Sequence, residues 1–144
     1  MGHRLTVSSP SSEYKFDERA ITKVTFGSDT PLESNARATD YGLSVKVYGR
    51  MLFDLTAAVA DPTLGLAQWS LVPSHKSECY RKFEVDVLSA SQIVRKFTLP
   101  QAFVMEYTEE LDDETGVGTF YLHVKQKKDE NTNVKIDGGF ASDD

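Results

Sequence analysis

Four short runs between residues 78 and 128 are rich in Val, Ile, Phe, Tyr and Thr. They cover residues 78–88, 93–98, 102–108 and 116–128, and turn-prone residues separate them. Runs of this kind are typical of neighbouring strands in an antiparallel β-meander. We therefore predict four consecutive strands in this part of the chain.

The first and the last run alternate strictly between apolar and polar side chains. Such a strand buries one side and leaves the other to water or to a partner. The third run differs, because residues 102–105 are apolar on both faces. We expect a helix, another sheet or another subunit to cover its second face. The side chains predicted to share a buried face are Phe83, Val85 and Val87 in the first run and Phe120, Leu122 and Val124 in the last.

Further strands are predicted on both sides of the meander. They cover residues 3–7, 20–26, 41–48 and 133–137, and the third of them places Leu43, Val45 and Val47 on one face. Together with the meander they give seven to eight strands. The fold class is therefore mainly β, a single-domain, mostly antiparallel β-sandwich or barrel with one short α-helix.

Two polar segments separate the early strands. Residues 8–19, which contain Pro10 and several serines, are predicted to form a loop or a flexible arm. Residues 27–40 begin with a Gly-Ser-Asp-Thr-Pro turn cluster and form a long excursion between two strands. Loops of that length are uncommon inside a compact domain and usually serve function.

One segment predicts a helix, around residues 62–72. Asp61 is a suitable N-cap, and Pro62 occupies the first helical position. Pro73 ends the segment, and a weaker helical turn is expected after Asp54. We expect Trp69 to pack where this helix meets the sheet. The predicted apolar face of the helix consists of Leu64, Ala67, Trp69 and Leu71.

Length and charge restrict the possible functions. The chain has 144 residues, of which 40% are hydrophobic and 26% are charged, which predicts one domain with a core of its own. Its net charge of −6 argues against a nucleic-acid binder, which carries a concentrated basic face. It contains neither a run of eighteen apolar residues nor a signal segment at its N-terminus. We therefore expect a chain made in the cytoplasm, with no membrane segment and no specific nucleic-acid site.

No catalytic or metal-binding motif is visible. Cys79 is the only cysteine, and His75, four residues before it, lacks the surroundings of a known thiol–imidazole pair. The acidic cluster at residues 109–114 stands between two predicted strands and reads as a hairpin loop. Zinc, calcium and nucleotide motifs are missing. The expectation is a protein that is not an enzyme and takes no cofactor or metal.

The order of the elements resembles that of the tube-protein superfamily of contractile injection machines. This superfamily includes Hcp-type proteins of type VI secretion and the tail tubes of contractile phages. The similarity covers roughly residues 20–137. Its most specific phrases are Ser-Asn-Ala-Arg-Ala-Thr-Asp at 34–40, Tyr80-Arg81, Val-Arg-Lys-Phe-Thr-Leu-Pro-Gln-Ala-Phe-Val at 94–104, and Gly-Thr-Phe-Tyr-Leu-His-Val-Lys-Gln-Lys-Lys at 118–128.

The resemblance implies six-membered rings of this chain, which stack into a tube inside a sheath. The partners implied are further copies of the chain, the sheath protein, and baseplate and tape-measure proteins. The chain then divides into an N-terminal strand and flexible arm (1–19), a tube-like β-barrel domain (20–137) and a flexible tail (138–144). The particle would be a virion tail or an extracellular or injected tube.

Contact and lumen residues follow from the same resemblance. The excursion at 27–40 would reach the next ring, and the apolar segment at 102–105 would be covered by the helix or a neighbour. The polar side of one strand would line the lumen, and the choice between the first and the last run of the meander stays open. The contact candidates are Asn35, Arg37, Asp40, Phe103 and Met105, and the lumen candidates are Glu84 and Asp86, or Thr119, Tyr121, His123 and Lys125.

Two alternatives are compatible with the same pattern. One is a monomeric β-barrel that binds a small ligand in its mouth, with residues 27–40 as a lid. The other is a tail adaptor or terminator protein. A ligand-binding barrel predicts an apolar cavity and a free monomer, whereas a tube subunit predicts large repeated interfaces.

Overall fold

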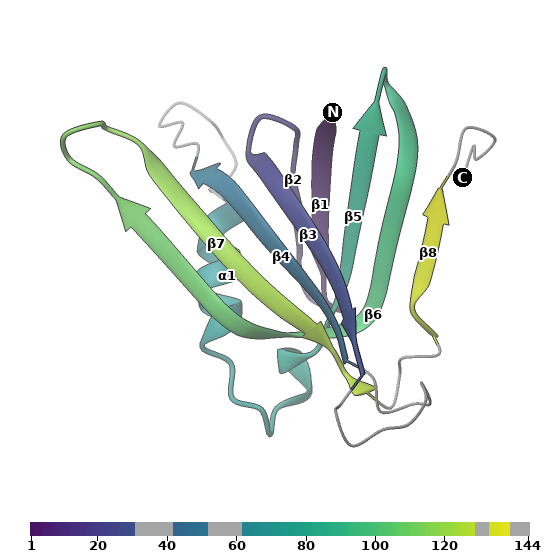
Figure 1. The fold of residues 1–144 in the computed structure, drawn as a ribbon. Coiled ribbons are helices and arrows are strands. Elements are labelled where there is room, and N and C mark those ends of the chain that lie inside the picture. The colour runs from purple at the N-terminus through teal and green to yellow at the C-terminus, as the bar shows by residue number, and fades with distance from the viewer. Residues whose placement is uncertain (31–41, 52–61, 129–132, 139–144) are drawn as a thin grey trace.

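The computed structural model describes residues 1–30, 42–51, 62–128 and 133–138. These residues form eight β-strands, one α-helix and one short 3-10 helix (Figure 1). The strands are β1 (Gly2–Ser8), β2 (Glu13–Phe16), β3 (Ile21–Asp29), β4 (Gly42–Met51), β5 (Arg81–Ser89), β6 (Gln92–Leu111), β7 (Gly118–Gln126) and β8 (Lys135–Gly138), and the helices are α1 (Pro62–Ser70) and η1 (Ser77–Cys79).

All eight strands belong to one antiparallel sheet, in the order β2-β1-β5-β6-β7-β4-β3, with β8 paired to β6 beside this path. The predicted fold class, mainly β with one short helix, is confirmed. The order also explains the meander, because β5, β6 and β7 are neighbours both in sequence and in the sheet.

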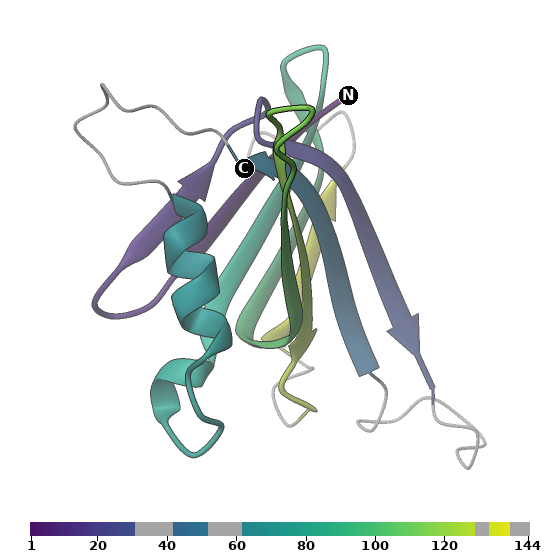
Figure 2. The same cartoon turned by 90° about the vertical axis from the view of Figure 1, so that its left-hand side faces the viewer.

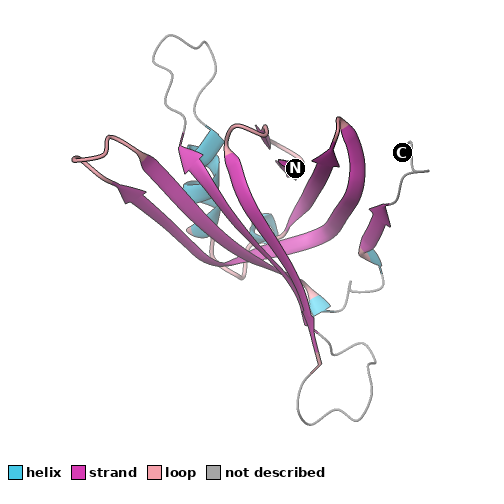
Figure 3. Ribbon diagram, turned by 45° about the horizontal axis from the view of Figure 1, so that its top comes forward, coloured by secondary structure: helices cyan, strands magenta, loops and turns pink. Residues whose placement is uncertain are grey.

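The sheet curls around a single hydrophobic core (Figure 3). Two ring contacts connect its distant parts: Phe16 of β2 lies 5.7 Å from Phe120 of β7, and Phe26 of β3 stacks on Phe97 of β6 at 4.6 Å between centroids. The predicted inward faces are confirmed, except that Val87 is only half-buried. Buried core residues include Leu5, Val7, Leu43, Val45, Val47, Phe83, Val85, Leu99, Phe120, Leu122 and Val124.

Helix α1 packs beside β2 and the long β6 (Figure 2). It begins at Pro62, as predicted, and buries Trp69 against the core, also as predicted. Its predicted apolar face is wrong, because Leu64 is 54% exposed and Leu71, just beyond the helix, is 81% exposed. The buried face consists instead of Thr63, Gly65, Leu66 and Trp69.

Gly65 in this helix faces an aromatic ring. A Cβ atom on Gly65 would overlap the ring of Tyr14 in β2. Glycine inside a helix costs about 1 kcal/mol relative to alanine. Here the absence of a side chain lets α1 approach β2 closely. The spacing of apolar residues in the sequence does not predict this close approach.

The second and third predicted runs of the meander are not separate strands. They form one strand, β6, which continues through Pro100. The pairing of β5 with β6 shifts between Arg81 and Phe83, and such an irregularity accommodates a proline. The buried side chain of Gln126 supports it, because its Oε1 accepts a hydrogen bond of 3.2 Å from the backbone N–H of Gln101.

Two predicted loops are partly strand. Glu13–Phe16, inside the predicted arm, pairs with β1 and ends the sheet as β2. The predicted turn at residues 27–29 belongs to β3, which pairs with β4 up to Asp29. Residues 31–40 of the excursion, the turn expected after Asp54 and the cap Asp61 lie outside the described residues. The predicted last strand is confirmed in a shorter form, β8.

Candidate assembly surface

The outer face of β7 carries all four lumen candidates from the last run of the meander. Tyr121, His123 and Lys125 alternate with the core residues of that strand and point away from them. Tyr121 lies 4.9 Å from the ring of Tyr48 in β4. A shallow hollow of about 360 Å³ lies beside this pair. It is lined by Thr22, Tyr48, Gly49, Thr108, Glu110, Thr119, Phe120 and Tyr121.

His123 stands between charges of both signs. Lys46 of β4 is directly across on one side, and Glu106 of β6 is across on the other. Partial burial lowers the pKa of His123, and Lys46 and Lys125 lower it further. Its buried Nε2 makes no hydrogen bond to the described residues. These effects favour the neutral imidazole on this face, and Glu106 opposes them.

The other pair of lumen candidates lies on the outer face of β5. Glu84 forms an ion pair of 3.2 Å with Lys96 of β6, which raises the pKa of the lysine. Asp86 lies opposite Lys96 where β5 pairs with β6, and opposite Arg4 where β5 pairs with β1. Burial raises the pKa of Asp86 all the same, and its Oδ1 has no hydrogen-bond partner among the described residues.

Both sets therefore point away from the core, from strands that flank β6 on opposite sides. One set is an acidic pair neutralised by basic neighbours, and the other is an aromatic and basic row. Thr119 belongs to the second set and is exposed.

The contact candidates Phe103 and Met105 differ in their surroundings. Phe103 is half-buried and packs edge-to-face on Tyr80, with ring centroids 5.9 Å apart. Met105 lies where the pairing of β6 with β7 shifts, between Val104 and Glu106, and it is 49% exposed. The sequence predicts that residues 102–105 are covered on both faces. Ala102 is buried, as expected, but Met105 is exposed. Asn35, Arg37 and Asp40 lie outside the described residues.

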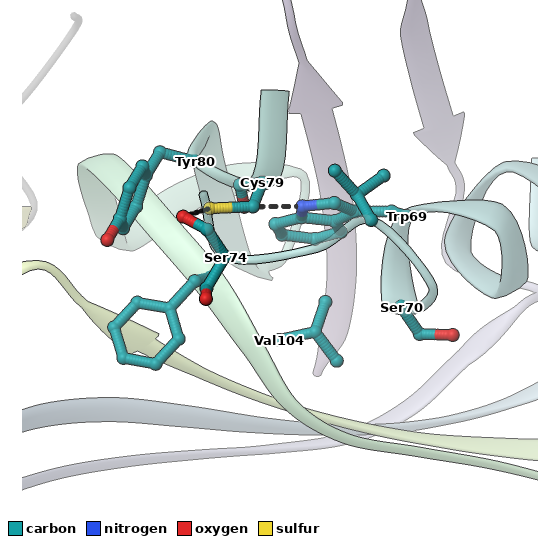
Figure 4. Close-up of a pocket in the computed structure, with 8 residues that line it drawn as sticks. Trp69, Ser70, Ser74, Cys79, Tyr80 and Val104 are labelled. Atoms are coloured by element: carbon teal, nitrogen blue, oxygen red, sulfur yellow. Dashed lines mark hydrogen bonds between the residues drawn. The ribbon is translucent and has the colours of Figure 1, made fainter. Parts of the chain in front are cut away.

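A second hollow lies between the C-terminal end of α1, the segment from Val72 to Tyr80, and β6 (Figure 4). It has a volume of about 150 Å³. The indole N–H of Trp69 donates a hydrogen bond of 2.8 Å to the carbonyl of Cys79, and the thiol of Cys79 donates to the carbonyl of Ser74 at 3.7 Å. The lining residues are Trp69, Ser70, Val72, Ser74, Cys79, Tyr80, Phe103 and Val104.

Sequence reasoning missed this hollow, because its residues come from a helix, the loop after it, the short 3-10 helix region and one strand. It also missed Arg81, whose guanidinium lies 5.5 Å from the ring of Trp69 and 5.9 Å from the ring of Tyr14. The only hint in the sequence is the Tyr80-Arg81 phrase. The thiol of Cys79 contacts a backbone carbonyl, and the nearby His75 is exposed.

Metal-binding and membrane-spanning features were also searched for. Across residues 1–30, 42–51, 62–128 and 133–138, no three His, Cys, Asp or Glu side chains gather as metal ligands would. Helices in the same ranges are too short and too polar to cross a bilayer. The acidic residues predicted to form a hairpin loop do connect β6 to β7, although Glu109 and Glu110 still belong to β6.

Comparison with known proteins identifies the fold. No family model matches this sequence, and no curated protein matches it. The structure of Hcp1 from Flavobacterium johnsoniae matches with a TM-score of 0.56, over 96% of this chain and 97% of that chain, at 14% sequence identity. This chain has the Hcp fold.

A second solved structure agrees with this result. A chain of the anti-feeding prophage (AFP) baseplate, 6-fold symmetrised, matches with a TM-score of 0.55 and 15% identity. The match covers 95% of this chain and 93% of that chain. The Hcp-like fold thus extends over nearly the whole sequence.

Proposed function

We propose that this chain is a structural subunit of the inner tube of a contractile phage tail or phage tail-like injection particle. It forms rings of six copies around a lumen, and the rings stack inside a sheath. The observation that carries the proposal is the nearly full-length likeness to Hcp1 and to a chain of the AFP baseplate. The role is structural, with no reaction catalysed and no cofactor bound.

Open strand edges support assembly. β2 and β3 end the sheet of described strands, so each has one unpaired edge there. In β6, pairing with β5 covers residues up to Ala102, and the remainder up to Leu111 pairs with β7 alone. Unpaired edges invite other chains, and closure of a ring removes them. We propose that neighbouring copies in the ring meet along these edges.

The proposed lumen face is the outer side of β7 and β4, where Tyr121, His123 and Lys125 lie. The polar row there continues across three strands, from Lys46 through His123 to Glu106. The acidic pair Glu84 and Asp86 is instead neutralised within its own subunit by Lys96. Asn35, Arg37 and Asp40 remain our candidates for contacts between rings, and Phe103 and Met105 for contacts between subunits.

A second candidate function is a tail adaptor or terminator. The likeness to a chain of a 6-fold symmetrised baseplate favours it specifically. In either function the chain acts with sheath, baseplate and tape-measure proteins. A ligand-binding barrel has less support, because large apolar side chains fill the interior of the curled sheet.

Negative-stain electron microscopy of the purified protein tests the proposal. Rings and stacks of one uniform diameter are expected from a tube subunit, and single unstacked rings from an adaptor. Replacing residues 31–40 with a short Gly-Ser linker leaves β3 and β4 complete, so it should preserve rings and abolish stacks. Featureless monomers at every concentration would contradict both functions.

A further inference from the structure

The hollow beside α1 has the size and lining of a socket for one apolar side chain. Its volume of about 150 Å³ equals that of an engineered apolar cavity that accepts benzene. Val72, Phe103 and Val104 provide apolar walls, and Ser74 stands exposed at the rim (Figure 4). A Leu or Val side chain is therefore small enough to enter.

Basic groups surround this socket. The Nζ of Lys127 lies 5.0 Å from the ring centroid of Tyr80, which lines the socket. Arg81 stacks near Trp69, and Lys76 is exposed in the loop between α1 and η1. Acidic residues close in sequence to the lining include Glu78 and Glu106, while Asp129 and Glu130 lie outside the described residues. The rim thus favours an occupant that carries negative charge.

The hairpin between β6 and β7 has the complementary composition. It exposes two apolar side chains, with Leu111 66% and Val117 48% accessible. Between them the chain carries Asp112, Asp113 and Glu114. The hairpin therefore carries apolar side chains next to carboxylates, and the socket has apolar walls next to Lys and Arg side chains. The two surfaces are complementary in charge.

This hairpin is also preorganised. The backbone N–H of Asp112 bonds to the carbonyl of Val117 at 3.3 Å, and that of Gly116 bonds to the carbonyl of Asp112 at 2.9 Å. Gly116 has a φ of +68°, which favours glycine. A closed loop loses little conformational entropy when it binds a partner.

The hairpin and the socket of one molecule are too far apart to meet. Val104 lines the socket, and Leu111 lies seven positions further along the same extended strand. At about 3.3 Å per residue, this places the hairpin roughly 23 Å away. Figure 1 shows the hairpin projecting from the sheet, away from the loop that follows α1. A hairpin that enters this socket must therefore come from another copy.

We propose that the β6–β7 hairpin of one copy docks into the α1 socket of a second copy, with Leu111 or Val117 as the inserted side chain. The contact uses different surfaces on the two partners, so it is heterologous and repeats from copy to copy. It rests on the proposed function, because it supplies one of the interfaces of a self-assembling tube.

Disulfide trapping tests this contact, since the chain has only one native cysteine. In a Cys79→Ser background, Ser74→Cys and Val117→Cys place thiols on the socket rim and on the hairpin. Both native side chains are exposed, so the fold should persist, and an unchanged melting temperature confirms this. A disulfide requires Cα atoms about 4.4–6.8 Å apart, so it reports close docking.

Mild oxidation should give a ladder of covalent dimers, trimers and larger species in denaturing gels. The single variants S74C and V117C should give no ladder, because one thiol per chain allows a dimer at most. The matched control replaces Val117→Cys with Ile136→Cys, a position equally exposed but on β8. It should give no ladder either.

The possible outcomes test the hairpin contact and the proposed tube function separately. Rings or tubes without the 74–117 ladder overturn the hairpin contact and leave the proposed function standing. A ladder without rings or tubes supports the contact and contradicts the tube. Monomers without a ladder contradict both. A compensating charge swap adds a second test: Lys76→Glu or Glu114→Lys alone should weaken the ladder several-fold, and the two together should restore it.

Discussion

The indole N–H of Trp69 donates a hydrogen bond of 2.8 Å to the backbone carbonyl of Cys79. This bond attaches helix α1 to the segment that leads into β5, and both groups are buried. We expect Trp69→Phe to lower the free energy of unfolding by about 2–3 kcal/mol, because it leaves a buried carbonyl unpaired and opens a small cavity. Chemical denaturation measures the change.

The matched control for Trp69 is Leu71→Ala. Leu71 is equally close to the C-terminus of α1 but exposed, so its replacement should change stability by less than about 0.5 kcal/mol. An equal loss in both variants would contradict the role given to the Trp69 bond.

Gly65→Ala should destabilise the protein, although alanine is the better helix former. A Cβ at this position overlaps the ring of Tyr14, and overpacking costs about 1–3 kcal/mol, against a gain of about 1 kcal/mol in helix propensity. In a Tyr14→Ala background the overlap is gone, and the same substitution should become stabilising. A double-mutant cycle of melting curves measures the coupling, and additive effects would contradict the packing described.

Asp86→Asn should stabilise the monomer at neutral pH. Burial raises the pKa of Asp86 above its ordinary value of 3.8, so the folded chain retains a proton that the unfolded chain releases. The resulting penalty is absent below pH 3.8 and grows as the pH rises through the raised pKa. Melting temperatures should therefore differ at pH 7 and converge near pH 3.5. A lower melting temperature for the Asn variant at pH 7 would show that attraction to Lys96 outweighs burial.

His123 should make the fold sensitive to acid. Its folded pKa lies below the ordinary value of 6.5, so the stabilising effect is complete above pH 6.5 and declines as the pH falls toward the folded pKa. His123→Gln should reduce the loss of stability between pH 7.5 and pH 5. Some loss will remain, because burial also lowers the pKa of His3. His75→Gln, at an exposed position, is the control, and an equal effect there would contradict the assignment.

Alternation predicted the parts of the fold that have one clear inner face. In the middle of β4, β5 and β7, apolar side chains recur at every second position, so Val45, Phe83 and Leu122 could be assigned to the core. The helix start was predictable for an equally local reason, since Pro62 has a strong positional preference. Trp69 was placed correctly because a large apolar ring rarely stays in water.

Long-range packing decided the rest. β2 was missed because it buries only Phe16, and a pattern of four residues with one buried position has no period. The turn-prone residues between the second and third runs indicated a break, yet β6 continues through them, and Gln126, distant in sequence, accepts a hydrogen bond from the backbone N–H of Gln101 there. The buried face of α1 follows Gly65 and the ring of Tyr14, not the large side chains. The socket combines residues from four segments, which no local pattern brings together.

Native mass spectrometry of the purified full-length chain tests the central claim most directly. A tube subunit should give a closed species of six copies at low micromolar concentration, and still larger species in steps of six as the concentration rises. A chain that stays monomeric throughout, or stops at a dimer, would contradict the proposal that it builds the rings of an injection tube.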